Sequence, residues 1–167
     1  MRLLVAALRG FRGHPAHPAL TDVTVGAWTV NAVAAVCGLL GFLDVRMVDV
    51  AYISGVITLA SILLTIPTGA VDYVRIERGS SMRRTATLHW VVQIWATSIL
   101  LVATGLLGSN DGVRDPVLAE VLSVAGWLVM VFGSWVGGAM VTVHGMRVLN
   151  EPNMPTAEAI SPKFPPD

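Results

Sequence analysis

The sequence predicts an all-α fold, an integral membrane four-helix bundle whose helices run up and down in turn, and three observations predict it. The 167-residue chain is 54% hydrophobic and 13% charged, with a mean hydropathy of +0.68, too apolar for an ordinary soluble domain. Four windows lack Asp, Glu, Lys and Arg, namely 23–43, 50–71, 85–110 and 121–146. Each is long enough to cross a hydrocarbon core of roughly 30 Å as a helix. No span remains for a soluble catalytic domain, so we expect no enzyme that acts alone.

The first 22 residues are predicted to carry a short interfacial helix. Leu3, Leu4, Ala7, Leu8 and Phe11 recur at helical spacing with arginines between them, which is typical of an amphipathic helix at a membrane surface. The apolar run is too short for a signal peptide, so we expect no cleavage. At the other end, residues 147–167 are predicted to form an extended, proline-rich tail.

The distribution of basic residues predicts the orientation of the spans. Four spans put both tails and the middle loop, 72–84, on one side of the membrane. That side holds nine of the eleven basic residues, and the other side holds only Arg46 and Arg114. The positive-inside rule therefore predicts cytoplasmic N and C termini in a multi-pass protein of the inner membrane. The equal counts of basic and acidic residues, with no basic domain, argue against a nucleic-acid partner.

The second span carries a polar stripe at spacings of three and four residues, as on one helix face. Its members are Ser54, Thr58, Ser61, Thr65, Thr68 and Asp72. In lipid such small hydroxyl side chains belong at contacts between helices, so we interpret the stripe as packing rather than as a solute pathway.

The fourth span has a comparable stripe of small residues. Gly126, Met130, Gly133 and Gly137 share one face and end near His144. Gly133 and Gly137 lie four residues apart, and a glycine pair with this spacing usually marks a contact between helices. The alternative is a groove in which a flat macrocycle lies against bare backbone.

The histidines and two aspartates are predicted to converge at one membrane face, because the spans alternate in direction. The six residues are His14, His17, Asp22, Asp72, His89 and His144. A shared site and a structural cluster are equally compatible with this placement. In the structural alternative, Asp22 caps the first span and Asp72 pairs with Arg75 or Arg84. The acids predicted at the opposite face, Glu120 among them, lie in short hydrophilic connections and need no special explanation.

Three chemistries suit such a cluster. Two axial imidazoles from different helices suit haem b, and His89 with His144 is the first pair to test, with His17 and His14 as further candidates. A transition metal ion is the alternative, with ligands from His14, His17, Asp22, Asp72 and His89. Proton relay is the third.

The chain resembles a bacterial four-helix membrane family catalogued as domain of unknown function 2231. The segment GHPAHPALTD at 13–22, followed by VGAW at 25–28, is similar to the GHPxHPxLxDxPxGxW opening of that family. TGAVDY at 68–73, His89, and Gly137-Gly138 followed by His144-Gly145 match its later motifs. Some members carry a fused Rieske iron–sulfur domain, so the resemblance implies a redox context and an iron–sulfur electron-transfer partner.

These observations leave two main hypotheses. The first is a small subunit of a membrane redox or respiratory-type complex, whose histidine and aspartate cluster binds haem b or a metal beside other membrane subunits. The second is a non-catalytic accessory subunit that packs against larger membrane proteins. A small transporter ranks third, because no charge is predicted at mid-membrane.

Overall fold

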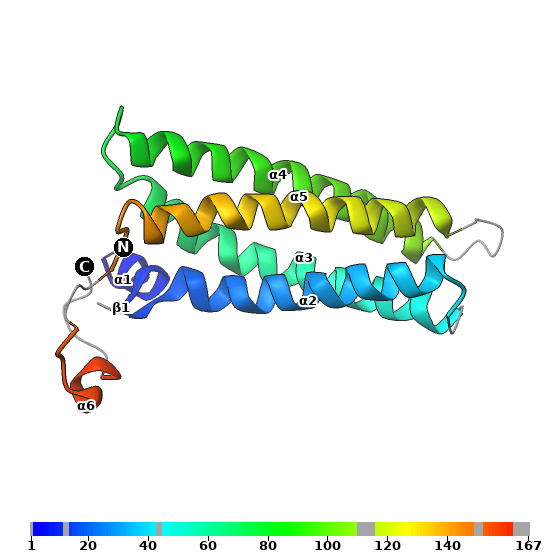
Figure 1. Cartoon of the computed structure of the whole chain (residues 1–167), viewed down its shortest axis with the longest axis horizontal. Coiled ribbons are helices and arrows are strands. Elements are labelled where there is room, and N and C mark those ends of the chain that lie inside the picture. The colour runs from blue at the N-terminus through cyan, green and yellow to red at the C-terminus, as the bar shows by residue number, and fades with distance from the viewer. Residues whose placement is uncertain (1, 12–13, 43–44, 110–115, 149–151, 162–167) are drawn as a thin grey trace.

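The computed structural model describes residues 2–11, 14–42, 45–109, 116–148 and 152–161, and most of them are helical (Figure 1). A short helix α1 (Arg2–Arg9) comes first, and two-residue strands β1 (Gly10–Phe11) and β2 (His14–Pro15) pair antiparallel after it. The later elements are α2 (Ala16–Leu39), α3 (Val45–Tyr73), α4 (Ser81–Gly108), α5 (Val117–Thr142) and the one-turn α6 (Thr156–Ala159). The predicted all-α class and four-helix architecture are confirmed.

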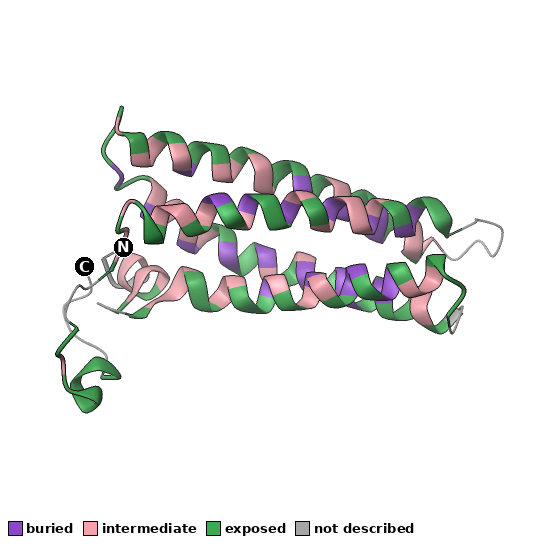
Figure 2. Cartoon of the chain, in the orientation of Figure 1, coloured by how far each residue is buried: buried purple, intermediate pink, exposed green. Residues whose placement is uncertain are grey.

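Each of the four long helices is long and apolar enough to cross a membrane. Their outward faces carry bare apolar side chains, with Leu63 71% exposed and Trp135 74% exposed. Figure 2 shows exposed residues along the outer sides of the helices and buried residues toward the middle of the bundle. An apolar surface this extensive is typical of contact with lipid rather than with water.

Helix α2 begins at Ala16, ahead of the charge-free window that starts at Val23. Pro15, at φ −67°, precedes the helix in an extended conformation, and Pro18 lies in the first turn, where a missing N–H removes no helical hydrogen bond. Asp22 is therefore an exposed residue inside the helix. The alternative in which Asp22 caps the first span is wrong.

The predicted N-terminal helix is present as α1, which packs against α2 and α3. The chain reverses between α1 and α2 at Gly10, which has φ +74°. A Cβ at this position would lie 2.5 Å from the His14 carbonyl oxygen. Only glycine fits this turn, which brings Arg9 back over the end of the bundle.

Two antiparallel hairpins form the bundle: α2 packs along α3, and α4 packs along α5 (Figure 1). Small residues of α5 lie directly on α4. A Cβ on Gly126 would lie 3.3 Å from Ile99 Cγ2, and one on Gly133 would lie 3.0 Å from Val92 Cγ1. The glycine stripe of the fourth span is therefore a packing seam between these two helices.

The middle of the bundle is a cluster of buried side chains from all four long helices. Its members are Trp28, Ile62, Ala96, Leu100 and Met130. These apolar groups pack against one another in the interior of the bundle.

The hydroxyl stripe of α3 faces inward, as the sequence predicts, and Ser54, Thr58, Thr65 and Thr68 are buried. Thr24 of α2 joins this stripe, because Ser61 donates to its hydroxyl and Thr65 shares a hydrogen bond with it. Hydroxyl side chains therefore link α2 to α3.

We expect Gly126→Leu to destabilise the bundle, because the added side chain would collide with Ile99 and separate α4 from α5. Overpacking of this kind typically costs about 1–3 kcal/mol. Gly138→Leu is the matched control on the same helix, since a Cβ there meets nothing within 4 Å. Thermal unfolding in detergent checks the prediction, and equal losses in the two variants would contradict it.

Candidate functional site

Four of the six predicted site residues take part in contacts at one end of the bundle, the end where N and C lie in Figure 1. These four are His17, Asp72, His89 and His144. His14 lies on β2 and is exposed, and Asp22 is exposed on α2. The structure therefore brings the residues to one end and divides them among separate contacts.

His17 joins the first hairpin. Its Nδ1 lies 3.0 Å from Thr68 Oγ1 and 3.3 Å from the Thr65 carbonyl oxygen. The Thr68 hydroxyl donates its own hydrogen to the Thr65 carbonyl, so it accepts from His17 and Nδ1 carries the proton. The imidazole lies against Gly69, where a Cβ would be 2.8 Å from His17 Cε1.

His89 joins the second hairpin in the same manner. Its Nδ1 lies 2.8 Å from the Gly133 carbonyl oxygen. A carbonyl oxygen only accepts, so Nδ1 is again the protonated nitrogen. The ring lies against Gly137, where a Cβ would be 2.9 Å from His89 Cε1. In both hairpins the histidine bonds to a carbonyl one helical turn before a glycine and lies on that glycine.

This hydrogen bonding fixes the chemistry of both rings. With Nδ1 protonated, Nε2 keeps its lone pair and is the nitrogen able to bind a metal centre. Metal-bound histidines generally donate their other N–H to a carbonyl or a carboxylate, as both rings do here.

The sequence paired His144 with His89, but in the structure His144 contacts Thr85. Its Nε2 lies 3.1 Å from Thr85 Oγ1, and the Thr85 hydroxyl donates to the Ser81 carbonyl. His144 Nε2 is therefore the donor in this contact, which joins the segment after α5 to the start of α4. Ligation through Nε2 would require this bond to break.

Within the described ranges, no group of three or more His, Cys, Asp or Glu side chains is placed to hold a metal ion. A stand-alone transition metal ion generally takes three or four protein ligands. A haem iron takes two axial ligands, so a pair of imidazoles is enough for it.

Asp72 joins three segments of the chain. The carboxylate is 8% exposed, and Arg147 Nη1 donates to its Oδ1 at 2.8 Å. Arg9 Nε lies 3.6 Å from the same oxygen. The structural alternative paired Asp72 with Arg75 or Arg84, whereas the ion pairs of Asp72 among the described residues are with Arg147 and Arg9; Arg84 donates to the Gly79 carbonyl. Asp72 thus ties α1 and the segment after α5 to the end of α3.

Sequence reasoning missed a second set of buried polar groups, toward the opposite end. Glu120, expected in a hydrophilic connection, is 2% exposed inside α5, and a Cβ on Gly38 would collide with its carboxylate. Asn31 donates to the Ala51 carbonyl, and Thr104 lies against Gly55. The expectation that Glu120 needs no special explanation is wrong, because its placement on the helix face that packs inward buries it.

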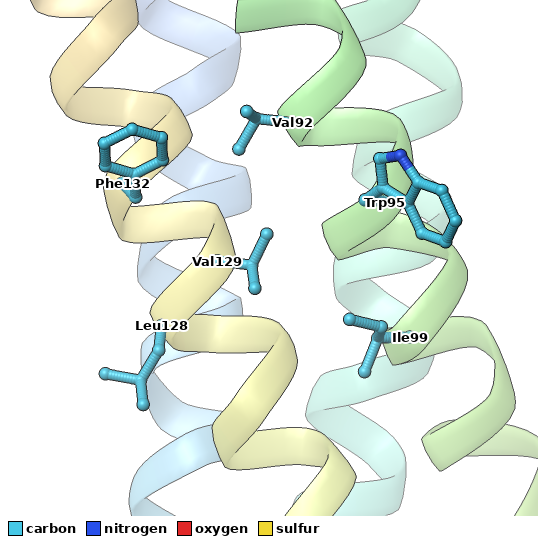
Figure 3. Close-up of a pocket in the computed structure, with 6 residues that line it drawn as sticks. All are labelled: Val92, Trp95, Ile99, Leu128, Val129 and Phe132. Atoms are coloured by element: carbon cyan, nitrogen blue, oxygen red, sulfur yellow. The ribbon is translucent and has the colours of Figure 1, made fainter.

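An apolar groove of about 660 Å³ lies between α4 and α5 (Figure 3). Its lining residues are Val92, Trp95, Ile99, Leu128, Val129 and Phe132. With no ionisable side chain in its lining, the groove offers only apolar contact.

Comparison with known proteins found one related family. The model of a family described as "Predicted membrane protein (DUF2231)" matches residues 13–150. No curated protein and no solved structure matches the chain.

We expect Asp72→Asn to destabilise the protein, since Arg9 and Arg147 would lose the buried carboxylate between them. Removing one partner of a buried ion pair typically costs about 3–5 kcal/mol. The variant should also expose α1 to trypsin. Denaturant unfolding and limited proteolysis check both effects, with Asp22→Asn as the exposed control on the same end of the bundle. A stability equal to that of the control would contradict the role assigned to Asp72.

Proposed function

Since the chain belongs to the DUF2231 family of membrane proteins, which matches most of its length, we propose that it is a small redox subunit of a membrane complex. In this proposal His17 and His89 bind haem b between the two hairpins. Its partners are other membrane subunits and an iron–sulfur electron-transfer protein, as the family resemblance implies.

One observation carries the proposal: the shared geometry of His17 and His89. Each ring donates from Nδ1 to a carbonyl or hydroxyl of the neighbouring helix and leaves Nε2 with its lone pair. The two rings come from different helices, and cofactor sites in helix bundles are built from side chains on facing helices. A haem bound there would supply one-electron transfer, and the surrounding residues would set its potential through burial and hydrogen bonding.

The other combinations predicted from the sequence have less support. His144 would have to give up its bond to Thr85 before its Nε2 could pair with His89. His14 and Asp22 are exposed, and Asp72 is held by Arg147 and Arg9. A metal ion bound by His14, His17, Asp22, Asp72 and His89 would therefore need several of these contacts to rearrange.

The second candidate function is a non-catalytic accessory subunit. The same hydrogen bonds favour it if their role is to hold the helices together. Each one joins the two helices of a hairpin, and each ring fills the space above a glycine. If fastening is their whole role, the protein needs no cofactor.

Asparagine substitutions separate the two functions, because the amide Nδ2 can replace the imidazole Nδ1 as a donor and nothing replaces Nε2. We expect the protein purified in detergent from haem-replete cells to show a Soret band. His17→Asn and His89→Asn should lose most of the band while melting within a few degrees of the wild type.

His14→Asn and His144→Asn complete the experiment, and we expect both to retain the Soret band. If His144→Asn loses the Soret band and His17→Asn retains it, the haem ligands are His89 and His144 instead. A colourless, normally assembled wild-type protein would instead support the accessory role and reject haem binding.

We further propose that the end bearing the site faces the cytoplasm of a bacterial inner membrane, on the strength of the basic-residue bias. The single native Cys37 can be replaced by serine, and a new cysteine placed at exposed Ser81 or at exposed Leu40, which lie at opposite ends of the bundle. In intact cells, a membrane-impermeant thiol reagent should label Leu40→Cys and spare Ser81→Cys. The opposite pattern would reverse the orientation.

A further inference from the structure

An open pocket of about 410 Å³ lies where α1, the end of α3 and the segment after α5 meet, and its lining includes three arginines. We propose that this pocket binds a phosphate group through Arg9, Arg75 and Arg147. The proposal does not depend on the haem site, because no histidine lines the pocket.

Arg147 supplies the central observation. Its side chain is 10% exposed, and Nη1 is used by Asp72. Its Nε and Nη2 are buried without a hydrogen-bond partner among the described residues. Buried guanidinium N–H groups are costly to leave unpaired. A small shift of the side chain toward the pocket would let one bound anion satisfy both nitrogens.

Arg9 is in a similar position. Its side chain is 11% exposed, its Nε lies 3.6 Å from Asp72 Oδ1, and that Nε has no hydrogen-bond partner in the described part of the chain. Burial and the neighbouring Arg75 and Arg147 lower the pKa of Arg9, against the opposing effect of Asp72. Two buried guanidinium groups therefore share one buried carboxylate, and the pocket keeps an excess of positive charge.

Two residues with positive φ angles after α5 place Arg147 at this pocket. Helix α5 ends with the N–H groups of His144 and Met146 donating to the carbonyls of Ala139 and Met140. Gly145 then takes φ +66°, and Arg147 takes φ +57°, the one positive φ of a non-glycine residue in the described segments. Such backbone strain is retained where the surrounding contacts fix the residue, and it is common at binding sites.

Phosphate is the anion that best fits these groups. Guanidinium groups present planar forks of N–H donors that match phosphate oxygens, and several arginines can surround one tetrahedral group. Exposed Glu77 and buried Asp72 are the acids of the pocket lining, so the three arginines outnumber them. Because the pocket lies at the end of the spans beside α1, the phosphate can come from a lipid headgroup or from solution.

The experiment uses the full-length protein in nanodiscs, with two sources of phosphate. Inorganic phosphate is titrated calorimetrically into protein in phosphatidylcholine nanodiscs at an ionic strength of about 0.15 M, where exposed charges are largely screened. In the second arm, native mass spectrometry measures retained lipid after phosphatidylglycerol is added to the nanodiscs. We expect saturable binding in at least one arm, and the arm that binds identifies the source.

Three variants assign the binding to the pocket. Arg75→Gln and Arg147→Gln should weaken it about tenfold or more, the effect of losing a charged hydrogen bond. Arg78→Gln removes the same charge from an exposed residue outside the pocket lining and should leave the affinity unchanged. Arg75 is exposed and outside the Asp72 ion pairs, so Arg75→Gln decides the matter if Arg147→Gln does not fold. Absence of binding in both arms, no effect of Arg75→Gln, or an equal effect of Arg78→Gln would overturn the proposal.

Discussion

A bilayer offers no hydrogen-bond partner to a polar group, so polar side chains of these spans are favoured where they find a partner within the bundle or at its ends. This constraint explains why the hydroxyls of α3 face α2 and bond either to it or to their own helix. It also explains why His17 and His89 point Nδ1 at the neighbouring helix. The glycines beneath the two rings follow from the same constraint, because a side chain there would keep the imidazole from its acceptor.

The buried carboxylate of Asp72 also needs partners, and it finds them in two segments outside the four long helices. One ion pair attaches α1 and the other attaches the segment after α5, so both segments are held at the same corner of the bundle. The corner gathers more positive than negative charge as a result. The phosphate pocket is thus a consequence of how the chain ends are anchored, and changes at Asp72 would affect both the stability of the protein and any anion bound there.

Much of the fold followed from the sequence, because window length, charge distribution and helical spacing are local properties. The convergence of the histidines at one end followed from alternating spans. The ion-pair partners of Asp72 could not be predicted from the sequence. Arg9 and Arg147 are distant in sequence from Asp72, and their approach depends on the turns at Gly10 and Gly145. The burial of Glu120 was missed for a similar reason, since a charge near a span boundary gives no indication of which helix face it occupies.

The two hairpins repeat one arrangement that the sequence does not display as a repeat. The carbonyl of Thr65 precedes Gly69 by one helical turn, as that of Gly133 precedes Gly137, and a histidine from the first helix of the hairpin covers each glycine. A structural hydrogen bond between the two helices is enough to explain the histidine in either hairpin. In both hairpins, however, that bond uses Nδ1 and leaves Nε2 available. Nε2 of each ring keeps its lone pair, so the haem proposed above would use these two nitrogens without breaking either hydrogen bond. The fastening and the ligand role are therefore compatible, since one uses Nδ1 and the other uses Nε2.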